Sequence, residues 1–157
     1  PLMQPRFACE LLQACQAQGI HTVLDTSGYA QWDVVAQAAA HTDLFLYDLK
    51  LMDDVQHRKY AGVSNQRILL NLKLILAGGA RVIVRIPLIP GVNDDESNLR
   101  KTQQFLAGLP GLAGVEVLPY HDIAQAKYSA LELAYRLPEL ASPPAERVEW
   151  AKALIGI

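Results

Sequence analysis

The sequence predicts an α/β fold built on a parallel sheet, and two observations carry that prediction. Short apolar runs that suit strands alternate with segments of helical periodicity at intervals of roughly 20 to 40 residues. Some of these runs, such as VIVRIPLI, are apolar almost throughout, which is typical of strands covered on both faces. Successive βαβ units place such strands in one sheet, either doubly wound or part of a (β/α) barrel.

The N-terminal half supplies two helices and two strands. Apolar residues recur at helical spacing from Phe7 to Cys15, and Gly19 is a suitable helix stop. IHTVLDTSG reads as a strand ending near Asp25, followed by turn residues. QWDVVAQAAAH then predicts a helix, and TDLFLYDLK predicts the second strand.

The C-terminal half continues the alternation after a polar loop. SNQRILLNLKLILAGG predicts a long helix capped by Ser64 and ending before Gly78. ARVIVRIPLIPGVND predicts a third strand, which Pro87 and Pro90 should terminate because proline cannot donate to a ladder. DDESNLRKTQQFLAGL predicts a helix, GVEVLPYHD a fourth strand followed by a long loop, and SPPAERVEWAKALIGI a last helix.

Composition narrows the class of protein. With 51% hydrophobic and 19% charged residues, residues 1–157 should form a single globular domain. The formal charge of -2 has no long run of one sign, so nucleic acid is not an expected partner. No long apolar run or signal peptide is present, so we expect a cytoplasmic protein without membrane association. Cys9 and Cys15 lie six residues apart on different faces of one helix, so we expect neither a disulfide nor a metal site.

Ionisable residues stand near the end of every predicted strand. Asp25 ends the first strand, Asp48 and Lys50 end the second, Arg85 lies near the end of the third, and His121 follows the fourth. Because the carboxyl ends of parallel strands meet at one rim, these side chains should converge there. Asp48 and Lys50 are two residues apart and therefore point to the same side. A rim of this kind suits a ligand that carries both charges and hydroxyl groups.

Each of these residues also has a structural interpretation. Asp48 and Lys50 alone could form a solvated ion pair, Asp25 could cap the following turn, and His121 could be an ordinary loop histidine. Arg85 is the hardest to explain structurally, because a guanidinium group inside an apolar strand needs a paired anion.

Five stretches, taken in order, resemble a known family: LDTSGY, YDLKLMD, YAGVSN, VRIPLIPGVNDD and VLPYHDIAQAKY. They are similar to the glycyl-radical-enzyme activating enzymes, among them the pyruvate formate-lyase activating enzyme, and the resemblance covers nearly the whole chain. That family belongs to the radical S-adenosylmethionine superfamily. The resemblance implies an incomplete, TIM-like (β/α)6 barrel, of which about four parallel strands stand in this chain.

The resemblance also implies roles for particular residues. It implies the following S-adenosylmethionine-binding residues: Asp25, Thr26, Asp48, Leu49, Lys50 and His121. Asp25 and Thr26 match residues close to the methionyl end of the ligand, where the resemblance also allows a monovalent cation. Arg85 matches an arginine of the active-site cavity and is the expected catalytic residue.

The resemblance implies an activity for the intact protein. It would cleave S-adenosylmethionine reductively at a 4Fe-4S cluster and abstract hydrogen from a glycine of a glycyl radical enzyme, with an electron donor such as flavodoxin. The CxxxCxxC loop that holds the cluster in the family is not in this sequence, and Cys9 and Cys15 cannot replace it. We therefore expect this chain to be the C-terminal portion of such an enzyme, inactive alone.

Two other functions fit the rim residues. An aldolase-like barrel enzyme could form a Schiff base at Lys50, with Asp48 and Asp25 beside it. A noncatalytic module could instead bind a partner through an exposed sheet edge.

Overall fold

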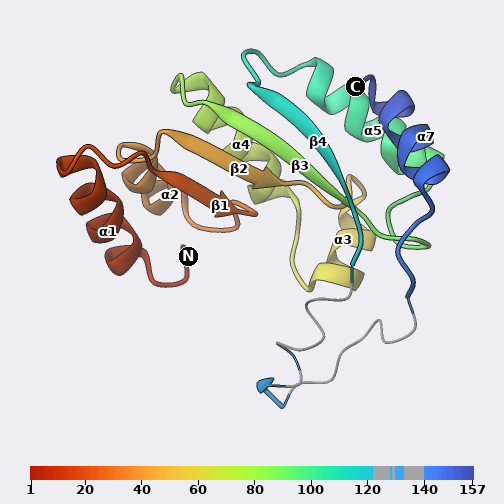
Figure 1. The fold of residues 1–157 in the computed structure, drawn as a ribbon, viewed down its shortest axis with the longest axis horizontal. Helices are drawn as coiled ribbons and strands as arrows, with labels where there is room; N and C mark the ends of the chain where they lie inside the picture. Colours follow the sequence, from red (N-terminus) through yellow and green to blue (C-terminus); the bar gives the residue numbers. More distant parts are fainter. Residues whose placement is uncertain (122–127, 129, 133–139) are drawn as a thin grey trace.

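The protein is built around one parallel sheet of four strands. The computed structural model describes residues 1–121, 128, 130–132 and 140–157. The strands are β1 (Val23–Thr26), β2 (Leu44–Asp48), β3 (Val82–Leu88) and β4 (Gly114–Pro119), paired side by side in that order (Figure 1). The predicted α/β class and parallel sheet are confirmed. The long loop expected after residue 122 lies largely outside the described residues.

The strand order separates the two arrangements that the sequence left open. A doubly wound sheet reverses its order at a switch point, whereas here each strand pairs with its neighbour in sequence without reversal. Sequential parallel strands are the arrangement of a (β/α) barrel wall. The helices that follow the strands lie behind the sheet or beside β4, so one face of the sheet is turned to the viewer uncovered (Figure 1).

Six helices are described. They are α1 (Pro5–Ala17), α2 (Trp32–Ala39), α3 (Asp54–Ala61), α4 (Gln66–Ala77), α5 (Glu96–Ala107) and α7 (Ala145–Ile155). Five of them match the predicted helices. The α1 helix is followed by Gly19 in a left-handed conformation, and Gly78 caps the end of α4, as expected.

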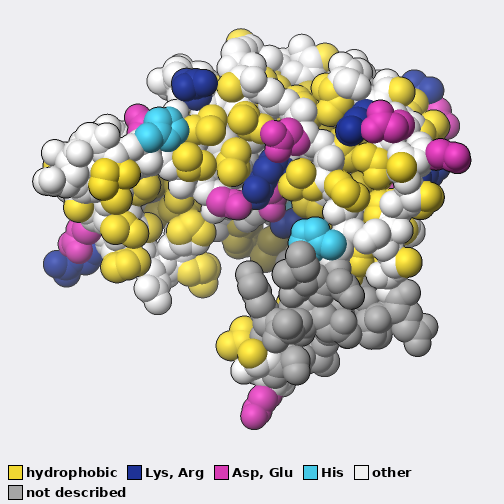
Figure 2. All heavy atoms as spheres, viewed as in Figure 1, with side chains coloured by type: hydrophobic (Ala, Val, Ile, Leu, Met, Phe, Trp, Pro, Cys, Tyr) yellow, Lys and Arg dark blue, Asp and Glu magenta, His cyan; other side chains and the backbone are white. Residues whose placement is uncertain are grey.

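Burial alternates strictly along β3, whose residues are buried and half-buried in turn. The buried residues of the strands pack against the helices and form the core with Leu72, Ile75 and Leu99. The other residues of each strand point to the open face of the sheet, by which we mean the face on which none of the described helices lies. Figure 2 shows this face as a hydrophobic surface with a group of acidic and basic side chains near its middle.

The expectation that Pro87 would end the third strand is wrong. Pro87 lies inside β3 and pairs with Leu118 of β4. Along β3 the carbonyl of Arg85 faces β2, where it accepts a hydrogen bond from Leu49, and that of Leu88 faces β4. Pro87 therefore has its nitrogen on the β2 side, beyond the last β2 residue, so its missing N–H removes no ladder bond.

The polar loop expected after the second strand contains a helix, α3. Asp53 caps its first turn by accepting a hydrogen bond from the Gln56 amide at 2.9 Å, and Gly62 ends it in a left-handed conformation. The apolar pattern missed this helix because His57 is its one buried residue. The cap position of α4 is Asn65 instead of Ser64, although the Ser64 hydroxyl accepts from the Gln66 amide.

Two further features concern the cysteines of α1 and the length of the helices. Cys9 and Cys15 are free and half-buried. No helix in the described ranges combines the length and apolar character needed to cross a bilayer.

Candidate functional site

Arg85 is the centre of a charged cluster on the open face of the sheet. Its Nε and Nη2 donate to Oδ1 of Asp48 at 3.2 and 3.0 Å, and Nη2 also donates to Oδ1 of Asp25 at 2.5 Å. Asp48 lies directly beside Arg85 in the sheet register. One guanidinium therefore links carboxylates from β1 and β2, and it supplies the paired anions that a charge in an apolar strand requires.

Electrostatics hold the Arg85 side chain in its charged form. Burial alone would lower the pKa of the guanidinium, because only 17% of the side chain is exposed. The hydrogen bond to Asp25 and the charges of Asp48 and Asp25 outweigh this effect and raise the pKa. Arg85 is therefore a permanent cation, suited to holding anions in place and not to moving protons.

Lys50 extends the cluster beyond the end of β2. Its ammonium lies 3.7 Å from Oδ2 of Asp48, the oxygen that Arg85 does not use. The Lys50 side chain is 38% exposed, whereas that of Asp48 is 21% exposed. Asp48 thus lies between two cations, and the Lys50 side chain is the more exposed partner of this ion pair. The ion pair anticipated from the sequence exists, but it is one part of a four-residue cluster.

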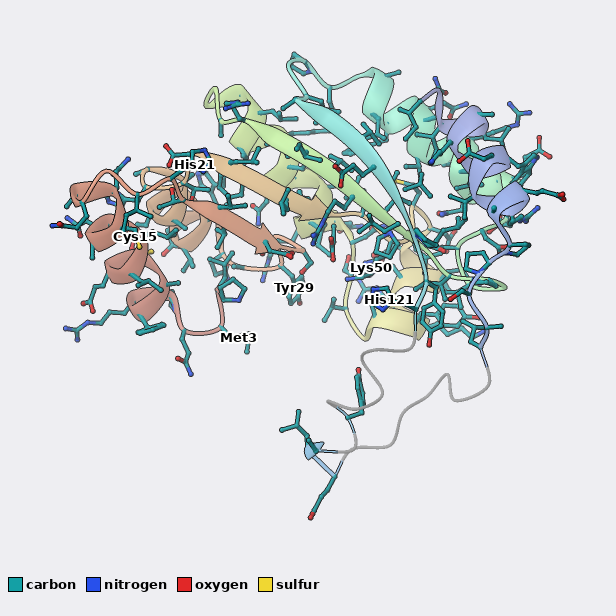
Figure 3. All side chains as sticks on the ribbon, in the orientation of Figure 1. Met3, Cys15, His21, Tyr29, Lys50 and His121 are labelled. Atoms are coloured by element: carbon teal, nitrogen blue, oxygen red, sulfur yellow. The ribbon has the colours of Figure 1, made fainter. Side chains whose placement is uncertain are left out.

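His121 lies close to Lys50 in the view of Figure 3, at the carboxyl ends of the strands, and Tyr29 is drawn nearby. His121 is exposed and follows β4 directly. Because the four strands are parallel, their carboxyl ends lie at one edge of the sheet, and His121 follows β4 at that edge. The part of the fifth motif at 122–127 lies outside the described residues.

Thr26 and Leu49, two of the expected ligand-binding residues, do not turn their side chains to the open face. Thr26 is buried in β1, and its hydroxyl accepts from the Gly28 amide at 3.0 Å. It is therefore Thr26, and not Asp25, that stabilises the turn after β1. Leu49 is buried in the core, and its amide donates to the carbonyl of Arg85.

The turn after β1 is fixed by contacts with buried residues of the core. Gly28 has a positive φ of 68°, and a Cβ placed there would lie 1.8 Å from the hydroxyl oxygen of Tyr47. Asn71 of α4 donates from Nδ2 to the carbonyls of Gly28 and Ala30, at 2.8 and 2.9 Å. These contacts fix the direction in which the chain leaves the rim beside Asp25.

Two candidate residues were missed by the sequence reasoning. Glu116 pairs in register with Arg85, so it lies on the same open face, and it is exposed. The signal was available, because a glutamate in the apolar run GVEVLP is as unusual as Arg85 in its own strand. Asn93 is fully buried and hydrogen-bonded to the segment that carries Lys50. Its surroundings could not be predicted from its neighbours in sequence.

Other parts of the described structure are weaker candidates for a functional site. Among the described residues, no group of three or more His, Cys, Asp or Glu side chains is arranged to hold a metal ion. A surface cavity of about 380 Å³ lies between α3 and the start of α5, lined by residues that include Asp53, Tyr60 and Lys101. None of the predicted site residues lines it, so the charged cluster remains the candidate site.

Comparison with known proteins identifies relatives of this chain. No family model matches it. The chain is 42% identical to the trans-4-hydroxy-L-proline dehydratase activating enzyme of Clostridioides difficile, over 94% of this chain and 49% of the relative. It is also 42% identical to the choline trimethylamine-lyase activating enzyme of Oleidesulfovibrio alaskensis, over 94% of this chain and 50% of the relative. The chain spans about half the length of these curated relatives.

A solved structure matches almost the whole fold. It is a domain of pyruvate-formate lyase-activating enzyme from Bacteroides vulgatus, with a TM-score of 0.82 and 32% sequence identity. The match covers 99% of this chain and 88% of that domain.

Proposed function

The chain belongs to the glycyl-radical-enzyme activating enzymes, and from this membership we propose that the whole protein activates a glycyl radical enzyme. Activation would use S-adenosylmethionine and a 4Fe-4S cluster, with an electron donor such as flavodoxin. Residues 1–157 would form one domain, the C-terminal portion of a radical S-adenosylmethionine barrel, in a cytoplasmic protein.

One observation supports the ligand part of this proposal more than any other. Asp25, Asp48, Lys50 and Arg85 form a connected cluster on the uncovered face of a barrel-like sheet. The cluster offers both signs of charge within one contact region, and S-adenosylmethionine carries a carboxylate, an ammonium, a sulfonium and ribose hydroxyls. Each polar group of such a ligand can find a partner of opposite character there.

The donor set of the cluster therefore fits S-adenosylmethionine. Lys50 would pair with the ligand carboxylate, and the carboxylates of Asp25 and Asp48 would accept from its ammonium and hydroxyl groups. Thr26 and Leu49 would contribute backbone groups, and His121 would contribute from the end of β4. Arg85 would act from the cavity wall by holding both aspartate side chains in place. When bound, S-adenosylmethionine and the 4Fe-4S cluster would supply the reductive cleavage and hydrogen-abstraction chemistry.

The residues of this chain do not fit the 4Fe-4S cluster. Such a cluster is held by several cysteine thiolates in one local arrangement. Cys9 and Cys15 lie on the single helix α1, which is packed against α2 and away from the charged rim. We propose that residues 1–157 alone do not carry out the reaction and that they provide one wall of the ligand site.

The decisive experiment uses the full-length protein. It is reconstituted anaerobically with iron and sulfide, reduced, and mixed with S-adenosylmethionine and a candidate glycyl radical enzyme. We expect a glycyl radical signal by electron paramagnetic resonance, and its loss in Lys50→Met but not in Lys73→Met. Lys73 is a suitable control because its ammonium lies over the Phe105 ring on the helical side of the fold. An undiminished signal in Lys50→Met would contradict the assigned role of Lys50.

The same reconstitution applied to residues 1–157 tests the remaining part of the proposal. We expect no 4Fe-4S signal from this chain. A normal cluster signal would show that residues 1–157 hold the cluster without the cysteine loop seen in the family. The Schiff-base alternative is disfavoured, because the relatives of this chain are activating enzymes. Borohydride trapping with a carbonyl substrate would detect an adduct at Lys50 if that alternative applied.

A further inference from the structure

The strands β2 and β3 end at different levels, and this difference leaves two backbone carbonyls without a partner in the sheet ladder. The last ladder contact between them is the hydrogen bond from the Leu49 amide to the Arg85 carbonyl. Beyond that point β3 continues to Leu88, while the chain after Leu49 leaves the sheet. The carbonyls of Lys50 and Pro87 therefore have no strand partner at this level, and Pro87 has no N–H with which to continue the ladder.

Asn93 replaces the missing ladder contact. Its Nδ2 donates to the carbonyl of Lys50 at 2.9 Å and to that of Pro87 at 2.7 Å. Its Oδ1 accepts from the Ile89 amide at 2.7 Å. The side chain is 0% exposed, so these bonds are made away from water, where a lost partner is costly. A single amide thus joins the segment carrying Lys50 to the end of β3.

Asn98 supports the same segment from α5. Its Oδ1 accepts from the Met52 amide at 2.9 Å, and its Nδ2 donates to the carbonyls of Asn93 and Lys50, at 2.9 and 3.4 Å. The Lys50 carbonyl therefore has two amide donors, of which Asn93 is the closer. We call the Asn93 and Asn98 side chains the amide clamp.

We propose that Asn93 is a positioning residue for the ligand carboxylate site, acting through Lys50. A lysine side chain is a flexible four-carbon stem, and Lys50 lies outside the sheet ladder, so the direction of its side chain depends on how its own backbone is held. The amide clamp fixes that backbone at the level of Pro87, which directs the ammonium toward Asp48 on the open face. The inference rests on the proposed function only for the identity of the ligand. The coupling between Asn93 and Lys50 is a property of the chain itself.

The first test is a double-mutant cycle on S-adenosylmethionine binding by the full-length protein, measured by calorimetry. Asn93→Asp keeps the shape and the Oδ1 acceptor but removes both donors. We expect about tenfold weaker binding in Asn93→Asp, because the free energy lost with the positioning of Lys50 should be about that of one strong hydrogen bond. In a Lys50→Met background the same change should weaken binding less than about twofold, because the residue that Asn93 positions is already gone. Equal losses in both backgrounds would overturn the proposal.

The second test needs no ligand. Lys50 and Lys73 are compared for their rate of acylation by acetic anhydride, read by mass spectrometry. We expect Asn93→Asp to raise the Lys50 rate about threefold or more, through the loss of its ordered pairing with Asp48, and to leave the Lys73 rate unchanged. Thr22→Val is the control for a buried hydrogen-bond loss elsewhere, because the Thr22 hydroxyl bonds to His41 and Asp43 before β1 begins. An unchanged Lys50 rate in folded Asn93→Asp would overturn the proposal.

The two tests separate this inference from the proposed function. If the wild-type protein does not bind S-adenosylmethionine, the proposed function fails, while the acylation comparison still decides whether Asn93 positions Lys50. Should Asn93→Asp fail to fold, Asn93→Ser removes both amide donors without adding a charge. It is judged by the same outcomes, with circular dichroism as the check on folding.

Discussion

Arg85 shows how much one residue decides at this site. It satisfies Asp25 and Asp48 together, and both carboxylates lie on a face whose surroundings are apolar. Removing the guanidinium would leave Asp25 without a counter-ion and Asp48 with Lys50 alone, which is more costly than losing a solvated pair. The proposed ligand site and the stability of the open face therefore depend on the same cation.

We expect Arg85→Met to lower the free energy of unfolding by about 2 to 3 kcal/mol, because it leaves the partly buried Asp48 carboxylate with Lys50 alone and the exposed Asp25 carboxylate unpaired. Urea unfolding of the 157-residue chain measures this. The matched control is Arg100→Met, which breaks an exposed Arg100–Glu96 pair of 2.7 Å on α5 and should cost less than about 0.5 kcal/mol. Equal costs for the two variants would mean that the cluster is no stronger than a surface ion pair.

Gly28 gives a second prediction at the residue scale, with Gly19 as its control. The two glycines have nearly the same φ, 68° and 69°, but a Cβ at Gly28 would meet the Tyr47 ring, whereas a Cβ at Gly19 would meet nothing within 4 Å. Gly19→Ala should cost about 1 kcal/mol from backbone strain alone. Gly28→Ala should cost about 3 kcal/mol or more, because it adds a clash with the core. Thermal and urea unfolding of both variants would show whether sterics separate them.

At the scale of elements, the junction between α3 and α4 depends on one carboxylate. Asp54 accepts from the Ser64 hydroxyl, the Asn65 amide and Arg58. These hydrogen bonds, that of Ser64 first, lower the pKa of Asp54 from 3.8 to about 2. A lowered pKa means that the folded chain favours the ionised form, so this carboxylate stabilises the fold above its ordinary pKa.

We expect Asp54→Asn to be less stable than the wild type at about pH 6, and the difference to shrink as the pH falls through about 4 toward 2. The reason is that the wild-type carboxylate becomes protonated there and loses its advantage. Urea midpoints across this pH range measure the trend. Ser64→Ala removes the strongest donor and should show the same trend with a smaller amplitude. A difference that does not change with pH would show that the charge of Asp54 is not what joins the helices.

The elements also show where sequence reasoning succeeds. Apolar periodicity located all four strands and five helices, because burial on one side of a sheet or helix leaves a pattern in the chain itself. It missed α3, whose signals are the Asp53 cap and Gly62. Sequence reasoning wrongly placed the end of the third strand at Pro87. Whether a strand can contain a proline depends on where the neighbouring strand stops, because only then is the missing N–H not needed for pairing. That information lies in a segment almost 40 residues away and cannot be read locally.

The candidate site likewise has features that could be predicted from the sequence and features that could not. The charged residues at the rim could be predicted, since parallel strands bring their ends together whatever the details of packing. The sharing of one guanidinium by two carboxylates could not, because it depends on register. The opposite orientation of Thr26 and the role of Asn93 likewise emerge only when side-chain directions are known.

For the whole molecule, the sheet should be most resistant to opening at β3. This strand is paired on both sides, whereas β1 is paired only with β2. We expect native-state hydrogen exchange to be slowest for the amides of β3 and markedly faster for those of β1, because local opening frees an edge strand more readily. Two-dimensional NMR in deuterated buffer measures the rates. Slower exchange in β1 than in β3 would indicate that the edge is protected by another part of the protein or by a second copy.

The anchoring of the charged groups in the strands has a consequence for how such proteins diversify. Asp25, Asp48 and Arg85 belong to the ladder itself, so the connecting segments can change in length and composition without moving them. Under the proposed function, recognition of a partner and binding of a small ligand would therefore be physically separable tasks. A graft of connecting segments from a relative with another target should alter the choice of target and leave the ligand wall intact.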